Sequence, residues 1–261
     1  MQDKVVWIIG ASSGIGEALT YKMSKLGAKL IISSRNREAL YKVKTKANGS
    51  PMDVHVHPLD LEDTASLSEA AALAFKMYGR LDYIIHSGGV SQRSLAMETD
   101  LKVAQKIMNI NFWGAVAITQ ATLPGMLTNH SGHIVIISSL VGKFGTKFRS
   151  SYSASKHALH GYFDSLRSET DPKIKISIIC PGFIKTNVTI NALTADGSKQ
   201  NSMDDAQANG MSANECALQI IKAIKAGKEE VNIGGKEKYA VLLKRYLPGL
   251  FSKIVRNAKV T

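Results

Sequence analysis

The sequence predicts an α/β protein built on a single doubly wound parallel sheet of about seven strands with helices on both faces. Apolar runs rich in Val and Ile alternate along the whole chain with segments of helical periodicity. The runs are continuously apolar, which is typical of parallel strands covered on both faces. No internal repeat or low-complexity linker interrupts the pattern, and 261 residues with 44% hydrophobic content suit one domain over residues 1–261.

The expected elements follow one another in strand and helix order. We expect strands at 5–9, 30–33, 54–58, 83–86, 133–138, 174–180 and 231–233. Helical patterns cover about 15–45, 64–78, 99–127, 151–168 and 213–226, the first of them running across the second strand. Parallel strands are connected by right-handed crossovers, and ligands bind at their carboxyl ends. Candidate functional residues are therefore sought directly after each strand.

A glycine-rich turn follows the first strand and opens a helix. Its spacing is G-x-x-x-G-x-G. Glycine lets the backbone approach a pyrophosphate, and the free amides and dipole of a helix start favour its negative charge. This arrangement predicts a Rossmann fold with dinucleotide contacts at Gly10, Ser12, Ser13, Gly14, Ile15 and Gly16. The alternative is a plain tight turn.

The end of the second strand bears on the choice of cofactor. An NAD site places a carboxylate there for the adenosine ribose, whereas this chain has Ser33-Ser34-Arg35-Asn36-Arg37. Arg35 can form a fork to a phosphate, with Ser34 and Asn36 beside it. We therefore expect NADP(H) to be preferred over NAD(H). The alternative is that Arg35 and Arg37 form the solvated first turn of a helix.

The remaining strand ends supply further cofactor candidates. Asp60 follows the third strand where an adenine amine would lie, although it could instead cap the next helix. His86 closes the fourth strand and is expected to be a structural histidine. The Pro-Gly turn after the sixth strand can close over a nicotinamide. The cofactor candidates from these strand ends are Asp60, Leu61, Ser87, Gly88, Pro181, Gly182, Ile184 and Thr186.

The chemistry is expected near the fifth strand. Ser139 precedes Tyr152 by thirteen residues, and Lys156 lies four residues further, one helical turn from the tyrosine. A free phenol has a pKa of ~10, and an ammonium ~4 Å away could lower it by about three units. Such a group can move a proton in carbonyl reduction or alcohol oxidation. Alone, the Tyr-Lys spacing also fits an ordinary helix face.

Composition excludes several function classes. Cys180 and Cys216 are too few for a disulfide framework and lack metal-ligand spacing, so we expect buried thiols and no metal site. The net charge is +12, of which +7 lies in residues 222–261, without a reading helix for nucleic acid. A strand begins at residue 5 and no apolar run approaches ~18 residues, so a cytoplasmic, soluble protein is expected.

Two late segments are expected to shape the substrate side. Residues 187–212 are polar and contain Gly197 and Gly210, as in a mobile lid, with Leu193, Met203 and Met211 as candidate substrate contacts. The segment 236–261 is apolar with basic flanks. Packing beside the lid or on a partner subunit is favoured over peripheral contact with an anionic membrane.

Together these motifs resemble the short-chain dehydrogenase/reductase family over essentially the whole chain. The stretches SGGVSQRSL, SKHAL and NALTADGS are most similar to its member-7-like branch, including 7B-type relatives. Some proteins of that branch carry an N-terminal membrane anchor, which we do not expect here. The chain departs from the family pattern at Ile9, where Thr is usual, and at His86–Gly89, where N-N-A-G is usual.

The resemblance implies a catalytic tetrad of Asn111, Ser139, Tyr152 and Lys156. Tyr152 would be the general acid or base, Ser139 would orient the carbonyl, Lys156 would bind the nicotinamide ribose, and Asn111 would hold a relay water. We expect an apolar carbonyl or alcohol substrate and a homodimer or homotetramer formed through helices near 99–127 and 151–168. The alternatives are a nucleotide-binding sensor or scaffold with little turnover and, less favoured, a nucleic-acid binder or an extended-type epimerase.

Overall fold

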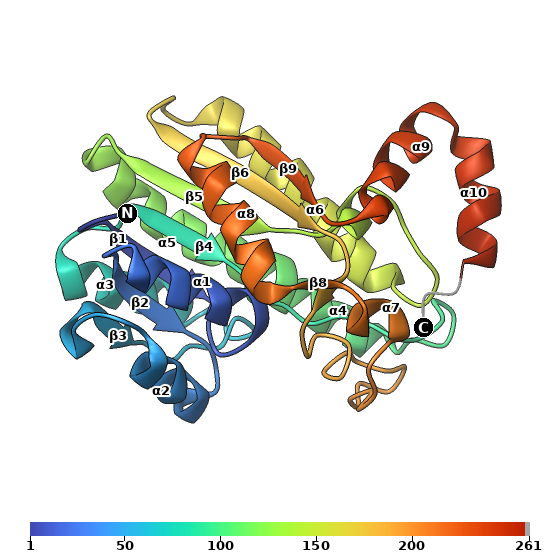
Figure 1. Ribbon diagram of the computed structural model, residues 1–261, viewed down its shortest axis with the longest axis horizontal. Coiled ribbons are helices and arrows are strands. Elements are labelled where there is room, and N and C mark those ends of the chain that lie inside the picture. Colours follow the sequence, from blue (N-terminus) through green and yellow to red (C-terminus); the bar gives the residue numbers. More distant parts are fainter. Residues whose placement is uncertain (259–261) are drawn as a thin grey trace.

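The computed structural model describes residues 1–258 and contains a seven-stranded parallel sheet, which confirms the predicted fold class (Figure 1). The strand order is β3-β2-β1-β4-β5-β6-β9, so the chain reverses direction across the sheet between β1 and β4. Ligands bind at such a switch point, outside the carboxyl ends of the strands. The strands are β1 (Val5–Ile9), β2 (Lys29–Ser33), β3 (Val54–Val56), β4 (Tyr83–His86), β5 (Gly132–Ile137), β6 (Ile174–Pro181) and β9 (Glu230–Ile233).

Side chains of successive strand residues enter two separate cores. In β1, Val5, Trp7 and Ile9 join one apolar cluster, whereas Val6 and Ile8 join the other. This alternation is the period of two of an extended strand, and it explains why β1 is apolar throughout. One face is covered by α1 (Gly14–Lys25), α2 (Arg37–Lys46) and α8 (Ala213–Lys225), the other by α3 (Leu67–Tyr78), α5 (Gly114–Thr128) and α6 (Ser150–Glu169).

Two expected helices are divided in the structure. The prediction of a single helix over 15–45 was wrong. α1 ends at Lys25, and Gly27, with φ of 73°, turns the chain into β2. The pattern over 99–127 contains α4 (Leu101–Met108), a π-helical turn at Asn109–Trp113, and then α5. Single π turns occur frequently at functional sites. Short 3-10 helices lie at Pro51–Asp53, Leu140–Gly142 and Lys236–Tyr239.

The segment 187–212 folds over the carboxyl ends of the strands. It contains α7 (Asp205–Ala208) and β8 (Met211–Ser212), which pairs with β7 (Ile184–Lys185). Leu193 forms a parallel bridge with Gln92 in the loop after β4. The segment is therefore fixed to the body of the protein at more than one point.

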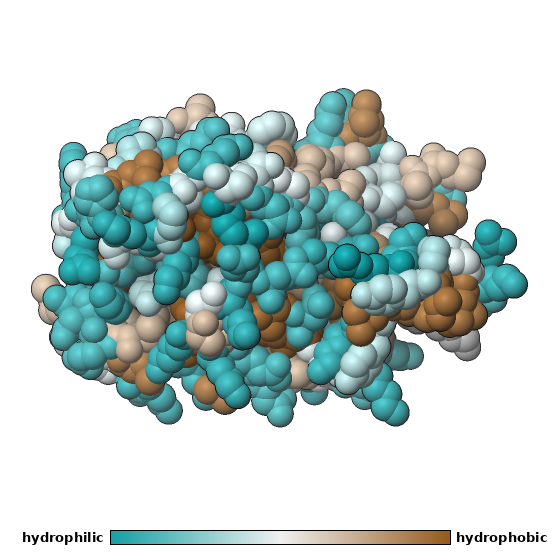
Figure 2. All heavy atoms as spheres, turned by 90° about the horizontal axis from the view of Figure 1, so that it is seen from above, coloured by the Kyte–Doolittle hydropathy of each residue, from teal (hydrophilic) through white to brown (hydrophobic). Residues whose placement is uncertain are grey.

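The C-terminal helices form a pair at one end of the molecule (Figure 1). They are α9 (Ala240–Tyr246) and α10 (Pro248–Asn257). Phe251 is buried with its ring 5.1 Å from that of Phe144, which attaches the pair to the body. Figure 2 shows apolar side chains at the surface over this end, where Leu242, Tyr246, Leu247, Leu250 and Ile254 are exposed. The last three residues of the predicted basic segment, 259–261, lie outside the described residues.

No helix among the described residues combines the length and apolar character that crossing a bilayer requires.

Two buried histidines make the fold sensitive to acid. His86 is buried at the end of β4, where its Nε2 lies 3.1 Å from the Thr119 hydroxyl, and burial lowers its pKa to about 3. Burial and the charge of Lys175 lower the pKa of His133 to about 4. Below pH ~6.5 the unfolded chain binds protons that these folded imidazoles exclude. The stability that depends on keeping these two histidines neutral is therefore fully present above pH ~6.5. It is lost as the pH falls towards the pKa values of the two histidines in the folded protein.

We expect His86→Asn to reduce this acid sensitivity. Each excluded proton contributes a slope of up to ~1.4 kcal/mol per pH unit, so the free energy of unfolding should fall by about 2 kcal/mol less between pH 6.5 and 5 in the variant. Urea unfolding at both pH values measures the difference. An unchanged pH dependence would show that His86 is not the neutral buried group described above.

Candidate active site

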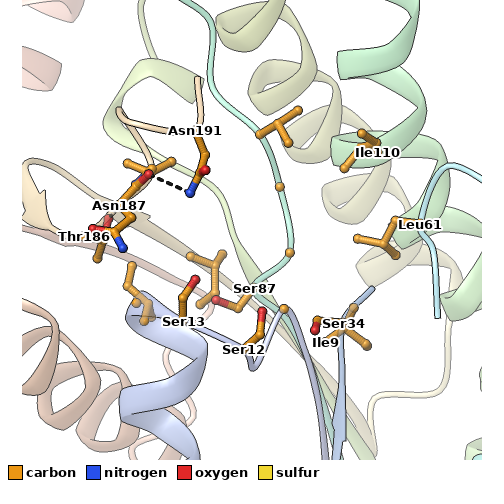
Figure 3. A pocket seen from close by; sticks show the side chains of 18 of the residues that line it. Ile9, Ser12, Ser13, Ser34, Leu61, Ser87, Ile110, Thr186, Asn187 and Asn191 are labelled. Carbon is orange, nitrogen blue, oxygen red and sulfur yellow. Dashed lines mark hydrogen bonds between the residues drawn. The ribbon is translucent and has the colours of Figure 1, made fainter. Parts of the chain in front are cut away.

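A cavity of about 410 Å³ lies across the carboxyl ends of the strands. Figure 3 shows Ser12, Ser13 and Ser87 along one side of it, with Leu61 and Ile110 on a second side and Asn187 and Asn191 on a third. The sequence-predicted residues that line it are Gly10, Ser12, Ser13, Gly14, Ile15, Ser34, Arg35, Asn36, Asp60, Leu61, Ser87, Gly88, Ser139, Tyr152, Lys156, Pro181, Gly182, Ile184 and Thr186. Gly16 and Asn111 are not among the lining residues and lie behind the cavity wall.

The glycine turn is shaped by close backbone packing. Gly10 has φ of 85°, and a Cβ there would lie 2.4 Å from the backbone nitrogen of Gly88. A Cβ on Gly16 would lie 2.2 Å from the carbonyl oxygen of Gly10, so Gly16 brings α1 against β1 instead of facing the cavity. The first amides of α1 have no partner within their own helix and open towards the cavity. This cradle fits a dinucleotide pyrophosphate.

Charged and polar groups gather at the adenosine end of the cavity. Arg35 is exposed, and its Nε lies 4.0 Å from Oδ1 of Asp60. The same Asp60 oxygen accepts the backbone N–H of Glu62 at 3.0 Å, so Asp60 stabilises a turn and does not cap α3. Asn36 accepts the N–H of Ala39 at 2.9 Å and caps α2. Arg35 therefore presents a cation beside the cavity, while Asn36 shapes the start of α2.

Ser139, Tyr152 and Lys156 converge at the inner end of the cavity. Ser139 follows β5, and its hydroxyl donates to the carbonyl of Pro181 at 3.3 Å. Tyr152 and Lys156 lie one turn apart on α6, with the ammonium 5.8 Å from the centre of the phenol ring. The ammonium donates to the carbonyl of Ile137 at 2.9 Å, which fixes it against the end of β5. A hydroxyl, a phenol and a buried cation thus face one space.

Asn111 is held in the π-helical turn between α4 and α5. Its amide oxygen accepts the N–H of Val90 at 2.8 Å, and its amide nitrogen donates to the carbonyl of Val90 at 2.9 Å and to the Ser155 hydroxyl at 3.0 Å. Its oxygen and the Lys156 ammonium both lie near Gly89, at 3.0 and 3.6 Å from the position of an added Cβ. Asn111 therefore connects the loop after β4 to α6.

The electrostatics around Tyr152 differ from the sequence-based expectation. Burial raises the pKa of Tyr152 above its ordinary value, opposed in part by a hydrogen bond with Ser139 and by the positive charges of Arg149 and Arg93. The lysine was expected to be the main group that lowers this pKa. Instead burial lowers the pKa of Lys156 itself to about 8, because its ammonium is removed from water. The phenol is therefore protonated at neutral pH in the protein alone.

Sequence reasoning missed a group of buried polar side chains beside α6. Gln92 accepts the N–H groups of Ser151 and Tyr152 at 2.8 and 3.2 Å, which satisfies amides at the start of this helix. Arg93 and Arg149 both bind Asp204. The sequence signal that could have indicated part of this group is the adjacent pair Gln92 and Arg93 in the SGGVSQRSL stretch.

The segment 187–212 contributes a different set of lining residues from the one expected. Leu193 lines the cavity, but Met203 and Met211 do not. The Met203 sulfur accepts the Thr189 hydroxyl at 3.1 Å, and Met211 packs against the core over α8. The segment's further lining residues are Asn187, Val188, Asn191, Lys199 and Gln207, and Asn191 donates to the Asn187 carbonyl at 3.1 Å (Figure 3).

A doubly wound sheet with a glycine cradle at its switch point, and a Ser-Tyr-Lys constellation formed by the end of β5 and the start of α6, defines a nucleotide-dependent oxidoreductase. The chain matches the family model described as short chain dehydrogenase over residues 4–196. This protein belongs to the short-chain dehydrogenase/reductase family and is an NAD(P)-dependent oxidoreductase. The resemblance found in its motifs is thereby confirmed.

Curated relatives of the same branch match nearly the full chain. Dehydrogenase/reductase SDR family member 7B of Mus musculus is 38% identical over 98% of this chain and 81% of its own length. Dehydrogenase/reductase SDR family member 7 of Homo sapiens is 38% identical over 95% of this chain and 75% of its own length. The chain is thus an oxidoreductase of the member-7 type.

Solved structures share the fold. A short-chain dehydrogenase from Streptomyces avermitilis superposes with a TM-score of 0.82 at 25% identity, covering 98% of this chain and 96% of the other. A Burkholderia phymatum enzyme in complex with NAD gives 0.84 at 20% identity, covering 100% and 98%. A Thermococcus sibiricus alcohol dehydrogenase complexed with 5-hydroxy-NADP gives 0.76 at 20% identity, covering 90% and 97%. Neighbours of this fold therefore include both NAD and NADP complexes.

Proposed function

We propose that this protein is an NADP(H)-dependent reductase that converts a carbonyl compound to its alcohol, with Tyr152 as the general acid. The observation that supports this most directly is the convergence of Ser139, Tyr152 and Lys156 on a cavity that begins at the glycine cradle. When bound, the cofactor supplies or accepts the hydride. The protein's own residues bind, orient and transfer the proton.

The preference for NADP(H) is proposed from the adenosine end of the cavity. Arg35 lines it as an exposed cation that can form a bidentate contact with a 2'-phosphate. Asp60 is 4.0 Å from the Arg35 Nε, so it can hold the guanidinium beside the site. β2 ends at Ser33 and is followed by Ser34, where an NAD site places a carboxylate.

The protonation state of Tyr152 suits this residue to the acid role that carbonyl reduction requires. Burial raises the pKa of this phenol, so the proton needed by the carbonyl oxygen is present at neutral pH. The Ser139 hydroxyl can hydrogen-bond the same oxygen and orient the carbonyl. The buried Lys156 ammonium, fixed by Ile137, is placed to hold the nicotinamide ribose and to stabilise negative charge as the proton leaves.

The substrate is proposed to be an apolar carbonyl compound. Val90, Ile110, Val188 and Leu193 supply apolar surface to the cavity, the last two from the segment 187–212. Burying such surface stabilises an apolar ligand by roughly 25 cal/mol per Å². We further propose a homo-oligomer formed through the helices at 101–128 and 150–169, where Leu101 and Trp113 are exposed.

Oxidation of NADPH with a panel of carbonyl compounds tests the function. We expect turnover with apolar ketones or aldehydes, at a higher kcat/KM with NADPH than with NADH. NADPH binding without turnover across apolar, sugar and small carbonyl compounds would favour the sensor or scaffold function. Absence of binding of both cofactors would contradict the proposal as a whole.

A further inference from the structure

The C-terminal helix pair carries two apolar stripes, one facing the body of the protein and one facing outward. In α10, Phe251 and Val255 lie one turn apart and pack on the apolar core of the body. Leu250 and Ile254, also one turn apart, are 49% and 50% exposed. We call the exposed apolar residues of the pair the outer stripe, and they are Tyr239, Leu242, Tyr246, Leu247, Leu250 and Ile254.

The spacing of the outer stripe places its members on one face of each helical segment. Residues three and four apart on a helix are neighbours on its surface. Tyr239, Leu242 and Tyr246 have this spacing, and Leu250 and Ile254 have it in α10. Figure 2 shows apolar surface over this end of the molecule. Contiguous exposed apolar surface marks a site that binds a protein, a membrane or a ligand.

The charges around the outer stripe are all positive. Residues 238–258 contain no Asp or Glu and five basic residues, Lys238, Lys244, Arg245, Lys253 and Arg256. None of the ion pairs within residues 1–258 includes any of these five cations. Lys238 lies 5.5 Å from the centre of the Tyr239 ring, and the Arg245 guanidinium lies 6.0 Å from that of Tyr246. Cations therefore stand directly beside the stripe.

This combination of apolar and basic side chains fits an anionic bilayer better than a second copy of the chain. Two copies that met through the outer stripe would bring two sets of five cations together with no acidic residue from 238–258 of either copy. An anionic bilayer offers negative headgroups to the cations and hydrocarbon to the apolar side chains at one boundary. The sequence alone favours packing over such contact, but packing on the body covers only the inner stripe.

The helix pair is attached to the body at two points. The ring of Phe251 lies 5.1 Å from that of Phe144. Immediately before the pair, the Glu237 carboxylate accepts the N–H of Phe183 at 3.3 Å and that of Gly235 at 3.0 Å. Phe183 belongs to the turn after β6, whose first residues line the cavity. The outer stripe is thus presented on a fixed support beside the cavity wall.

We propose that the α9–α10 pair docks this protein peripherally on an anionic phospholipid bilayer, with the outer stripe in the interfacial region and the five cations at the headgroups. The pair lies on the bilayer and does not span it. None of the residues of the outer stripe and none of the five cations lines the cavity, so the docking does not depend on the proposed reductase function.

Sedimentation with sucrose-loaded vesicles tests the docking on the purified full chain. Vesicles of phosphatidylcholine with about 30 mol% phosphatidylserine should bind the protein at least ~10-fold more tightly than vesicles of phosphatidylcholine alone. Raising the salt concentration from about 0.1 M to about 0.5 M should release the protein, because salt screens the cations from the headgroups. Equal binding to both kinds of vesicle, or binding to neither, would overturn the proposal.

Two variants separate the apolar contribution from the charged one. Leu250→Ser shortens the outer stripe and should weaken binding to the anionic vesicles by at least ~5-fold. The double variant Lys253→Gln with Arg256→Gln removes two cations and should weaken it by roughly 30-fold. The substituted side chains are exposed, so both variants should keep the melting temperature of the wild type.

Matched controls on α8 remove the same chemical groups from another surface. Leu218 is 54% exposed, and Lys222 and Lys225 are exposed on the same helix. Leu218→Ser, and Lys222→Gln with Lys225→Gln, should leave vesicle binding within about threefold of wild type. Losses equal to those of the C-terminal variants would show a general effect of composition and charge, and would overturn the assignment of this surface.

Analytical ultracentrifugation without vesicles tests the competing occupant. We expect the wild type and Leu250→Ser to have the same oligomeric state. A smaller assembly in Leu250→Ser, together with a wild type that does not bind vesicles, would show that a second copy covers the outer stripe and would overturn the proposal.

A fluorescent label locates the docked surface directly. Cys180 and Cys216 are buried free thiols, so Ile254→Cys supplies an accessible thiol for a nitrobenzoxadiazole label, and Leu218→Cys supplies one on α8. We expect the emission to shift to the blue on anionic vesicles for the label at position 254 but not at 218. The opposite result, or no shift at either position, would overturn the proposal. Because no turnover is needed, failure here is distinguishable from failure of the proposed reductase function.

Discussion

Replacing Tyr152 with phenylalanine is expected to lower kcat for NADPH-linked carbonyl reduction by at least ~10²–10⁴-fold, the usual contribution of a general acid. The phenol is the proposed proton source, and it lines the cavity together with Ser139 and Lys156. Its hydroxyl is lost but its ring remains, so the packing around α6 should be retained. Steady-state reduction of an apolar ketone measures the loss, and NADPH fluorescence titration should give a Kd within about twofold of wild type.

Tyr41→Phe is a matched control for this substitution. Tyr41 is exposed on α2 and does not line the cavity, so removing its hydroxyl should leave kcat unchanged. Substantial activity in Tyr152→Phe would refute the role assigned to Tyr152. Activity equally low in both variants would point to a general loss of folded protein, which the melting temperatures would reveal.

Replacing Arg35 with glutamate is expected to weaken NADPH binding by about 100-fold, since a charge-assisted contact is lost and a repulsive charge is added. NADH lacks the 2'-phosphate and should lose little affinity. The ratio of the two dissociation constants, from parallel titrations, is the diagnostic quantity. General damage to the cavity would weaken the binding of both cofactors alike, so it would leave this ratio unchanged.

Arg37→Glu supplies the control for Arg35→Glu. Arg37 is two residues away and carries the same charge change, but its guanidinium lies over the ring of Tyr41 at 5.7 Å and does not line the cavity. We expect Arg37→Glu to weaken NADPH binding only through the general change in charge, and by less than Arg35→Glu does. Equal loss of NADPH and NADH in Arg35→Glu would show that Arg35 does not read the 2'-phosphate.

Much of the fold could be predicted from the sequence because local patterns determine it. Continuous apolar runs locate all seven strands of the main sheet, with ends displaced by at most two residues. The shortest strand of the main sheet, β3, ends at Val56, before Pro58, which has no N–H to donate to a neighbouring strand. The glycine turn was recognisable because its conformation and close packing require glycine at Gly10.

The interior of the site could not be predicted to the same depth. Arg93 and Asp204 are separated by 111 residues, and no local pattern indicates that they meet. The role of Gly16 in packing α1 against β1, and the position of Asn111 behind the cavity wall, depend on how distant elements meet. The balance of burial and charge at Tyr152 likewise comes from residues outside the Tyr-Lys motif.

The most direct test of the central claim is transfer of deuterium from the C4 position of labelled NADPH to an apolar ketone in a single turnover. The product alcohol is analysed by mass spectrometry, with Tyr152→Phe in parallel. We predict stoichiometric deuterium at the former carbonyl carbon for the wild type and none above background for the variant. Bound NADPH that transfers no deuterium to any carbonyl compound tested would contradict the assignment of this protein as a reductase.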